Sequence, residues 1–179
     1  MTPGTIVLLH APFDSAGAWG DLPEMLRSYG LDVVAPSVPG DGMRYVARAS
    51  LIIAATAPAL PLVLVAYGNA GPLLPAMSVA QQAAHRRVGG YVFVDAELPR
   101  PQRQHDHDHD HEPISVPPEW PEAPCGYLRT HIDHTETPNA AAAARERAIR
   151  EARLRGWPVI EHEPPTAVAQ SLSELVATL

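Results

Sequence analysis

Short apolar runs alternate with amphipathic stretches along most of the chain. Continuous runs rich in valine, leucine and isoleucine predict four strands, and two less apolar runs predict a fifth and a sixth. Such continuous runs are typical of parallel sheets, because helices cover both faces of each strand. The predicted strands are residues 6–10, 31–35, 62–66, 88–94, 125–130 and 157–162.

Helical periodicity fills the stretches between these strands. Between 18 and 29 the apolar side chains recur about every 3.6 residues, and Gly30 follows where a helix commonly ends. Pro75 is expected to kink the helix that begins at 69. The predicted helices are residues 18–29, 45–56, 69–84, 136–156 and 166 to the end.

This alternation of strands and helices predicts an α/β fold. Parallel strands joined through helices require right-handed crossovers, which place helices on both faces of the sheet. We therefore expect a three-layer α/β/α architecture around a mostly parallel six-stranded sheet. A chain of 179 residues fits one such domain, over residues 1–179.

The pattern is interrupted between 97 and 124. This stretch is rich in proline, histidine and aspartate and has too little apolar content for a core element, so we expect an irregular loop. Within it, His105 to His111 alternate histidine with aspartate, and an extended backbone would place four imidazoles on one face. Metal binding is therefore an alternative function. A solvated loop is the simpler interpretation, because metal sites draw their ligands from separated, rigid segments, and we expect no dedicated metal site.

Composition and charge narrow the partners. The net charge of −7 argues against nucleic acid and against an anionic membrane surface, so a small neutral or amphipathic ligand fits better. The single cysteine, Cys125, excludes an internal disulfide and favours a cytoplasmic protein. The first residues, MTPGTIVLLHAP, match neither a signal peptide nor a membrane span. No cofactor is expected, and the sequence leaves the oligomeric state open.

Five segments, in order, resemble motifs of the α/β-hydrolase superfamily. LLHAPFDSAGAW resembles the strand that ends in an HG pair, DVVAPSVPGDG the following proline- and glycine-rich loop, and VLVAYGNAG the nucleophile elbow. YVFVDAELP and GWPVIEH resemble two later strands. The resemblance implies this fold over nearly the whole chain, with the loop at 97–124 in place of the helical lid.

The same resemblance implies a dismantled catalytic triad. The elbow position is Gly68, which offers no attacking atom, and the expected oxyanion donor is Pro12, which has no N–H. His162 stands where the catalytic histidine is expected, but only EPPT separates it from the last helix. Because acyl transfer depends on these parts jointly, we expect no serine-type hydrolysis.

A pocket at the carboxyl ends of the strands is what the resemblance leaves intact. Candidate acid–base residues there are His10, Tyr67, Asp95 and His131. Each has a structural alternative: His10 as a hydrogen-bond partner of a neighbouring loop, Asp95 as a turn cap and Tyr67 as a space-filling ring. The candidate ligand-binding residues are Pro12, Phe13, Asp14, Gly68, Asn69 and Asp133.

The leading hypothesis is a lidless, degenerate α/β-hydrolase-like protein that binds a small organic ligand without hydrolysing it. The alternative is a cyclase, isomerase, lyase or dehydratase that uses pocket histidine, tyrosine and aspartate as acid and base. A third hypothesis is a structural partner whose pocket mouth is an interface.

Overall fold

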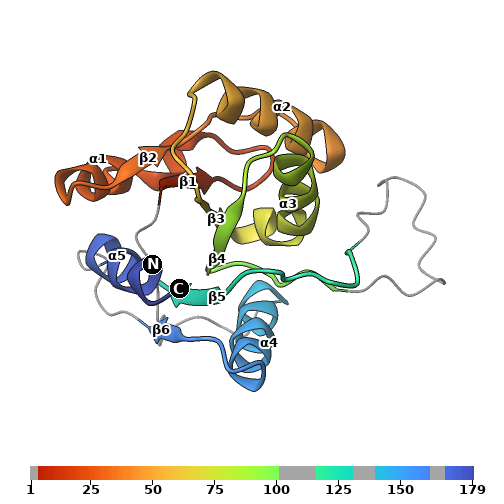
Figure 1. The fold of residues 1–179 in the computed structure, drawn as a ribbon. Helices are drawn as coiled ribbons and strands as arrows, with labels where there is room; N and C mark the ends of the chain where they lie inside the picture. The colour runs from red at the N-terminus through yellow and green to blue at the C-terminus, as the bar shows by residue number, and fades with distance from the viewer. Residues whose placement is uncertain (1–3, 101–115, 131–139, 162–167) are drawn as a thin grey trace.

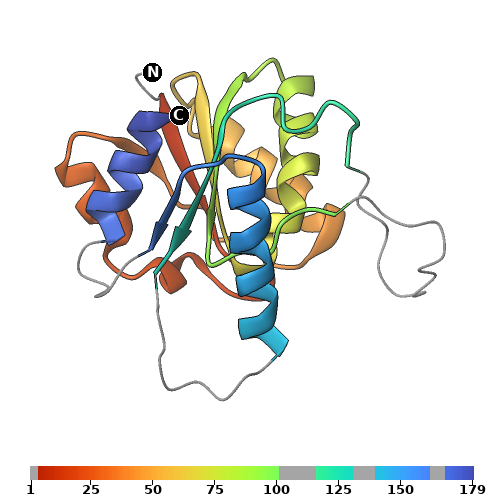
Figure 2. The same ribbon diagram turned by 90° about the horizontal axis from the view of Figure 1, so that it is seen from below.

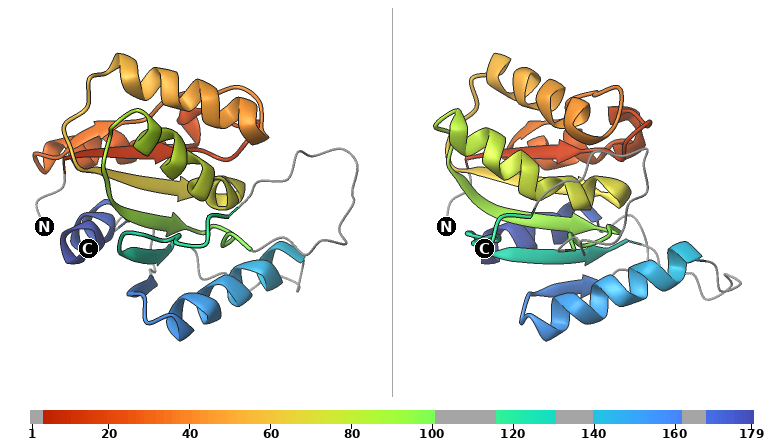
Figure 3. Two further views of the ribbon diagram at one scale, coloured as in Figure 1. Left: turned by 45° about the vertical axis from the view of Figure 1, so that its right-hand side comes forward. Right: turned by 90° about the vertical axis from the view of Figure 1, so that its right-hand side faces the viewer.

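A six-stranded sheet organises the residues that the computed structural model describes, which are 4–100, 116–130, 140–161 and 168–179 (Figure 1). The strand order is β2-β1-β3-β4-β5-β6, and every neighbouring pair is parallel. The arrowheads of β1, β3 and β4 accordingly point the same way in Figure 3. The predicted fold class is confirmed. The strands are β1 (Thr5–Leu9), β2 (Asp32–Val34), β3 (Leu62–Tyr67), β4 (Val88–Val94), β5 (Cys125–Arg129) and β6 (Val159–Glu161).

Helices cover both faces of this sheet (Figure 2). One face is packed by α1 (Leu22–Ser28) and α5 (Val168–Thr178), and the other by α2 (Gly42–Ala55), α3 (Leu74–Ala83) and α4 (Ala140–Leu154). Side chains alternate between the two cores along β1: Ile6 and Leu8 join the α1/α5 core, while Val7 and Leu9 join the other. This double burial explains why the strands read as continuous apolar runs.

The first predicted helix is divided in the structure. A 3₁₀ helix, η1 (Ala16–Trp19), ends at Gly20, whose φ of 53° takes the chain out of the helical region. α1 then begins at Leu22 with Pro23 in its first turn, where a missing N–H costs nothing. The apolar period from 18 to 29 therefore spans two short elements.

The third predicted helix is divided for a similar reason. A 3₁₀ helix, η2 (Gly68–Leu73), contains Pro72, and α3 starts at Leu74 with Pro75 in its first turn. The predicted kink at Pro75 is wrong, because the proline marks the start of the α-helix and breaks no hydrogen bond within it.

The long loop is irregular where the structure describes it. Residues 97–100 and 116–124 form no helix or strand, and the His105–His111 tract lies outside the described residues. The helix predicted from 136 is described from Ala140 onward. In the described part of the chain, no helix is both long and apolar enough to cross a membrane.

One carboxylate fastens the returning part of this loop to the body of the protein. Glu122 Oε1 accepts hydrogen bonds from Ser78 Oγ at 2.5 Å, from Gln82 Nε2 at 2.8 Å and from the Tyr91 hydroxyl. Burial alone would raise the pKa of Glu122, but these hydrogen bonds outweigh it and hold the pKa below its usual value. The loop is thereby joined to α3 and β4 just before β5 begins.

Replacing this carboxylate should destabilise the fold in a pH-dependent way. We expect Glu122→Gln to lower the free energy of unfolding by at most about 1 kcal/mol near neutral pH, since the three donors then meet a neutral amide oxygen and solvent screens this exposed position. A carboxyl group whose pKa is lower in the folded state stabilises the fold only while it is ionised. The difference in unfolding free energy between wild type and variant should therefore shrink as the pH falls below about 4. Urea unfolding at several pH values tests this. Glu119→Gln, at an exposed position of the same loop, is the control.

Candidate functional site

The turn after β3 has a left-handed backbone at its first residue. β3 ends at Tyr67, and Gly68, the first residue of η2, has a φ of 56°. Residues with a Cβ pay about 1–2 kcal/mol in this region, whereas glycine does not. There is nevertheless room for a side chain, because a Cβ at Gly68 would lie 3.6 Å from the Cβ of Ala11.

Three residues farther on, the backbone has no such room. A Cβ at Gly71 would lie 2.0 Å from the carbonyl oxygen of Glu97. The Glu97 N–H also donates to the Gly68 carbonyl at 3.3 Å. The turn is therefore packed directly against the loop that follows β4. Glycine is required at 71 by the lack of space and is favoured at 68 by the backbone conformation.

Left-handed backbone also occurs at the ends of the two strands that flank β3. Phe13, after β1, has a φ of 65°, and Asp95, directly after β4, has a φ of 46°. Non-glycine residues in this region cost free energy and often occur at functional sites. Together with Gly68, they place strained or glycine-dependent backbone along the carboxyl edge of the sheet.

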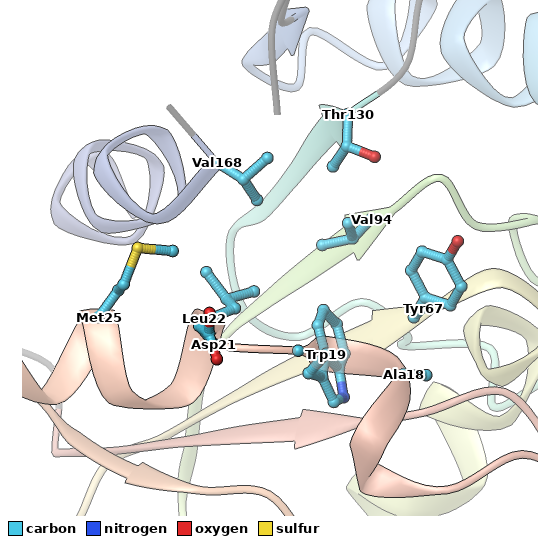
Figure 4. A pocket seen from close by; sticks show the side chains of 10 residues that line it. Ala18, Trp19, Asp21, Leu22, Met25, Tyr67, Val94, Thr130 and Val168 are labelled. Atoms are coloured by element: carbon cyan, nitrogen blue, oxygen red, sulfur yellow. The ribbon is translucent and has the colours of Figure 1, made fainter. Parts of the chain in front are cut away.

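A cavity of about 550 Å³ lies on the α1/α5 face of this edge (Figure 4). It is within the range of small-molecule sites, about 300–1,000 Å³. Its walls come from η1, the start of α1, the ends of β3, β4 and β5, and the start of α5. The lining residues are Ala18, Trp19, Gly20, Asp21, Leu22, Met25, Tyr67, Val94, Thr130 and Val168.

Two aromatic rings form one side of the cavity. Trp19 and Tyr67 meet edge to face, with ring centroids 5.6 Å apart and an interplanar angle of 66°. They stand next to each other in Figure 4, across the cavity from Met25 and Val168. Trp19 is buried, and its Nε1 has no hydrogen-bond partner among the described residues.

Asp95 supplies a buried charge beside this wall. One carboxylate oxygen accepts from the Thr130 N–H at 3.0 Å and the other from the Thr130 hydroxyl, so the side chain is fixed between β4 and β5. Burial and the charges of Asp95 and Asp14 raise the pKa of Tyr67, and Arg145 acts in the opposite direction. The Tyr67 phenol is therefore protonated near neutral pH and can donate a hydrogen bond.

Solved structures share this architecture over the full chain. An extracellular α/β-hydrolase from a Paenibacillus species, described as homologous to tobacco salicylic acid binding protein 2, superposes with a TM-score of 0.70 at 16% identity, covering 98% of both chains. The protein has the α/β-hydrolase fold. A pyrethroid hydrolase matches with a TM-score of 0.67 at 13% identity over 98% of both chains. Tomato methylketone synthase I, complexed with 2-tridecanone, matches with 0.66 at 14% over 99% of both.

These similarities establish the fold and leave the activity open, because all three identities are low. No family model and no curated protein matches the chain. Within the α/β-hydrolase fold, Gly68 occupies the strand-to-helix turn that the sequence resemblance assigns to the nucleophile.

His10 is built into the scaffold. It is fully buried, its Nδ1 lies 2.7 Å from the Ala11 carbonyl oxygen, and its Nε2 accepts the Val38 N–H at 2.8 Å. Its ring also packs edge to face on Tyr45. Both ring nitrogens are engaged with backbone, and His10 does not line the cavity. These contacts match the structural alternative, in which His10 is a hydrogen-bond partner of a neighbouring loop. They include no contact that an acid–base role would require.

The other predicted residues divide into those at the cavity and those beside it. Tyr67 lines the cavity, and Asp95 acts on Tyr67 from behind the wall. Three predicted loop residues are not among those that line this cavity: Phe13 is 80% exposed, Asp14 accepts from the Ser15 N–H, and Asn69 is exposed. Pro12 and Gly68 also lie outside the cavity lining. His131, Asp133 and His162 fall outside the described residues.

Sequence reasoning missed most of the cavity wall. Trp19 was assigned only to a helix, and Asp21, Val94, Thr130 and Val168 were not considered. Alternation along the strands could have found two of them. Val94 ends β4 and lies on the same face as Val92, and Thr130 follows β5 on the same face as Leu128. Among the described residues, no group of three or more metal-ligating side chains is assembled.

The electrostatic link between Asp95 and Tyr67 can be measured. We expect Asp95→Asn to lower the pKa of Tyr67 while leaving it above its usual value, because burial remains the larger cause. Asp14→Asn should lower it by less. Titration of the phenol carbon resonance, assigned with Tyr67→Phe, provides the measurement. Glu119→Gln should change nothing, and an unaltered pKa of Tyr67 in Asp95→Asn would refute the link.

Proposed function

We propose that this protein uses the α/β-hydrolase fold to bind a small organic ligand and does not act as a hydrolase. The observation that carries the proposal is the combination of Gly68 at the elbow, with no nucleophile, and a cavity of about 550 Å³ beside it. An accessory or carrier role fits this combination, with neither nucleic acid nor a membrane as partner.

The cavity walls favour a mainly apolar ligand. Leu22, Met25, Val94 and Val168 present hydrocarbon or thioether surface, and two aromatic rings complete the wall. The Tyr67 phenol and the Thr130 hydroxyl are the polar groups at the strand ends. A few polar groups in a largely apolar cavity are typical of sites that orient small molecules.

Acid–base catalysis is the second candidate function. The observation that favours it is the protonated Tyr67 phenol at the cavity wall, whose pKa the Asp95 carboxylate raises. This pair could donate a proton or a hydrogen bond to a bound carbonyl, as a lyase or isomerase requires. His10 is not part of this proposal, because both its nitrogens are engaged.

Restoring the missing nucleophile tests the non-hydrolytic assignment. We expect Gly68→Ser to fold, because its Cβ meets only Ala11 at van der Waals distance and the strain is about 1–2 kcal/mol. Hydrolysis of p-nitrophenyl esters should stay near background in wild type and variant alike, because a serine without an oriented base is a weak nucleophile. Gly68→Ala, with the same strain and no hydroxyl, is the control.

Efficient hydrolysis by Gly68→Ser would contradict the proposal. Adding His131→Ala or His162→Ala to the active variant would then identify the base. Labelling of wild type by a fluorophosphonate probe, seen by intact mass, would contradict it independently.

Filling the cavity tests ligand binding. With methyl heptyl ketone as the probe, we expect Val168→Trp to weaken binding at least about tenfold, because the indole occupies space beside Met25 and Val94. Val79→Trp, at a half-exposed position on α3 across the sheet, should leave binding unchanged. Isothermal titration calorimetry provides the dissociation constants. Equal binding by the two variants would show that the probe sits elsewhere.

A further inference from the structure

The aromatic wall and the charges around the cavity restrict the ligand class further. Trp19 and Tyr67 meet edge to face, with ring centroids 5.6 Å apart and an interplanar angle of 66°. The face of an aromatic ring attracts a cation, and two rings at an angle can contact a cationic group from two sides. Both residues line the cavity, where they stand next to each other (Figure 4).

Two carboxylates, Asp21 and Asp95, lie in or next to the cavity lining. Asp21 lines the cavity, and although it is the N-cap residue of α1, its side chain makes no capping hydrogen bond. Asp95 is hydrogen-bonded to the lining residue Thr130, and its charge raises the pKa of Tyr67 on the aromatic wall. Both groups favour positive charge in the cavity.

Positive side chains do not balance these carboxylates at the cavity surface. Among the described lining residues, none is arginine, lysine or histidine. Arg145 on α4 is the cation whose charge reaches Tyr67, and it lies outside the lining. A ligand carboxylate would therefore enter beside Asp21 with no basic partner on the wall, which Coulomb repulsion disfavours.

We infer that the cavity selects organic cations, specifically alkylammonium groups that bear an apolar chain. The cationic head lies against the Trp19 and Tyr67 rings, within the field of the Asp21 carboxylate. The apolar chain packs on the opposite wall of Met25, Leu22 and Val168. This inference rests on the proposed ligand-binding function and adds the charge of the ligand to it.

Three probes with one skeleton and different charges test the inference on the full chain. Phenylpropyltrimethylammonium, phenylpropanol and phenylbutanoate are titrated calorimetrically at neutral pH. We expect the cation to bind about tenfold more tightly than the alcohol, and the carboxylate to bind most weakly. The Trp19 indole resonance, assigned with Trp19→Phe, should shift with the cation and so place it at this wall.

Variants separate the aromatic and the carboxylate contributions. Asp21→Asn, at an exposed position, should weaken binding of the cation about threefold and leave the alcohol unchanged. Tyr67→Leu should remove most of the preference for the cation, whereas Tyr67→Phe should keep it, because the ring face remains. Glu119→Gln, which removes one charge far along the chain in the loop before β5, should have no effect.

The outcomes distinguish this inference from the proposed function. Equal affinity for the three probes, with binding still blocked by Val168→Trp, would overturn the charge preference and leave ligand binding intact. Tighter binding of phenylbutanoate would also overturn it. Failure of all three probes to bind would contradict both proposals.

Discussion

The packing of the turn after β3 against the loop after β4 is the constraint on which the carboxyl edge of the sheet depends. At Gly71 the carbonyl of Glu97 occupies the position that a side chain would take, and the Glu97 N–H donates back to Gly68. The chain leaves β3 through Gly68, a left-handed residue, and enters η2 at once. Tyr67 is the last strand residue, and its side chain packs against the α1/α5 core.

A second set of contacts keeps that edge rigid from the other side. His10 accepts from Val38 N–H, and the Tyr45 hydroxyl donates to the His10 carbonyl at 2.7 Å, so the end of β1 is tied to the loop after β2 and to α2. Asp95 joins the end of β4 to Thr130 after β5. His10 and Asp95 therefore differ in what they do. His10 makes structural contacts, whereas Asp95 makes structural contacts and also raises the pKa of Tyr67 at the cavity wall.

The sequence predicted the sheet better than the site. Buried strands can be predicted from the sequence because both of their faces are apolar, and β4 was predicted with its observed bounds of Val88–Val94. Helix starts were harder to predict. Pro23 and Pro75 lie in the first turns of α-helices, yet the apolar period runs through the 3₁₀ helices before them. Tyr67 and Asp95 were found because strand ends meet at one edge. Trp19, Asp21 and Val168 were not, because their meeting depends on how α1 and α5 pack together.

Protonation of Tyr67 limits the chemistry that this edge of the sheet can perform. A phenol whose pKa is raised by burial and by Asp95 is a hydrogen-bond donor near neutral pH and a poor general base. Both carboxylate oxygens of Asp95 are engaged, one by the Thr130 N–H and the other by the Thr130 hydroxyl. Among the described lining residues, the Tyr67 and Thr130 hydroxyls can orient a ligand, and the Asp21 carboxylate can attract a positive charge. The proposed binding role uses these groups as they stand, whereas proton abstraction from a substrate would fall to Asp21, the one carboxylate among the described lining residues.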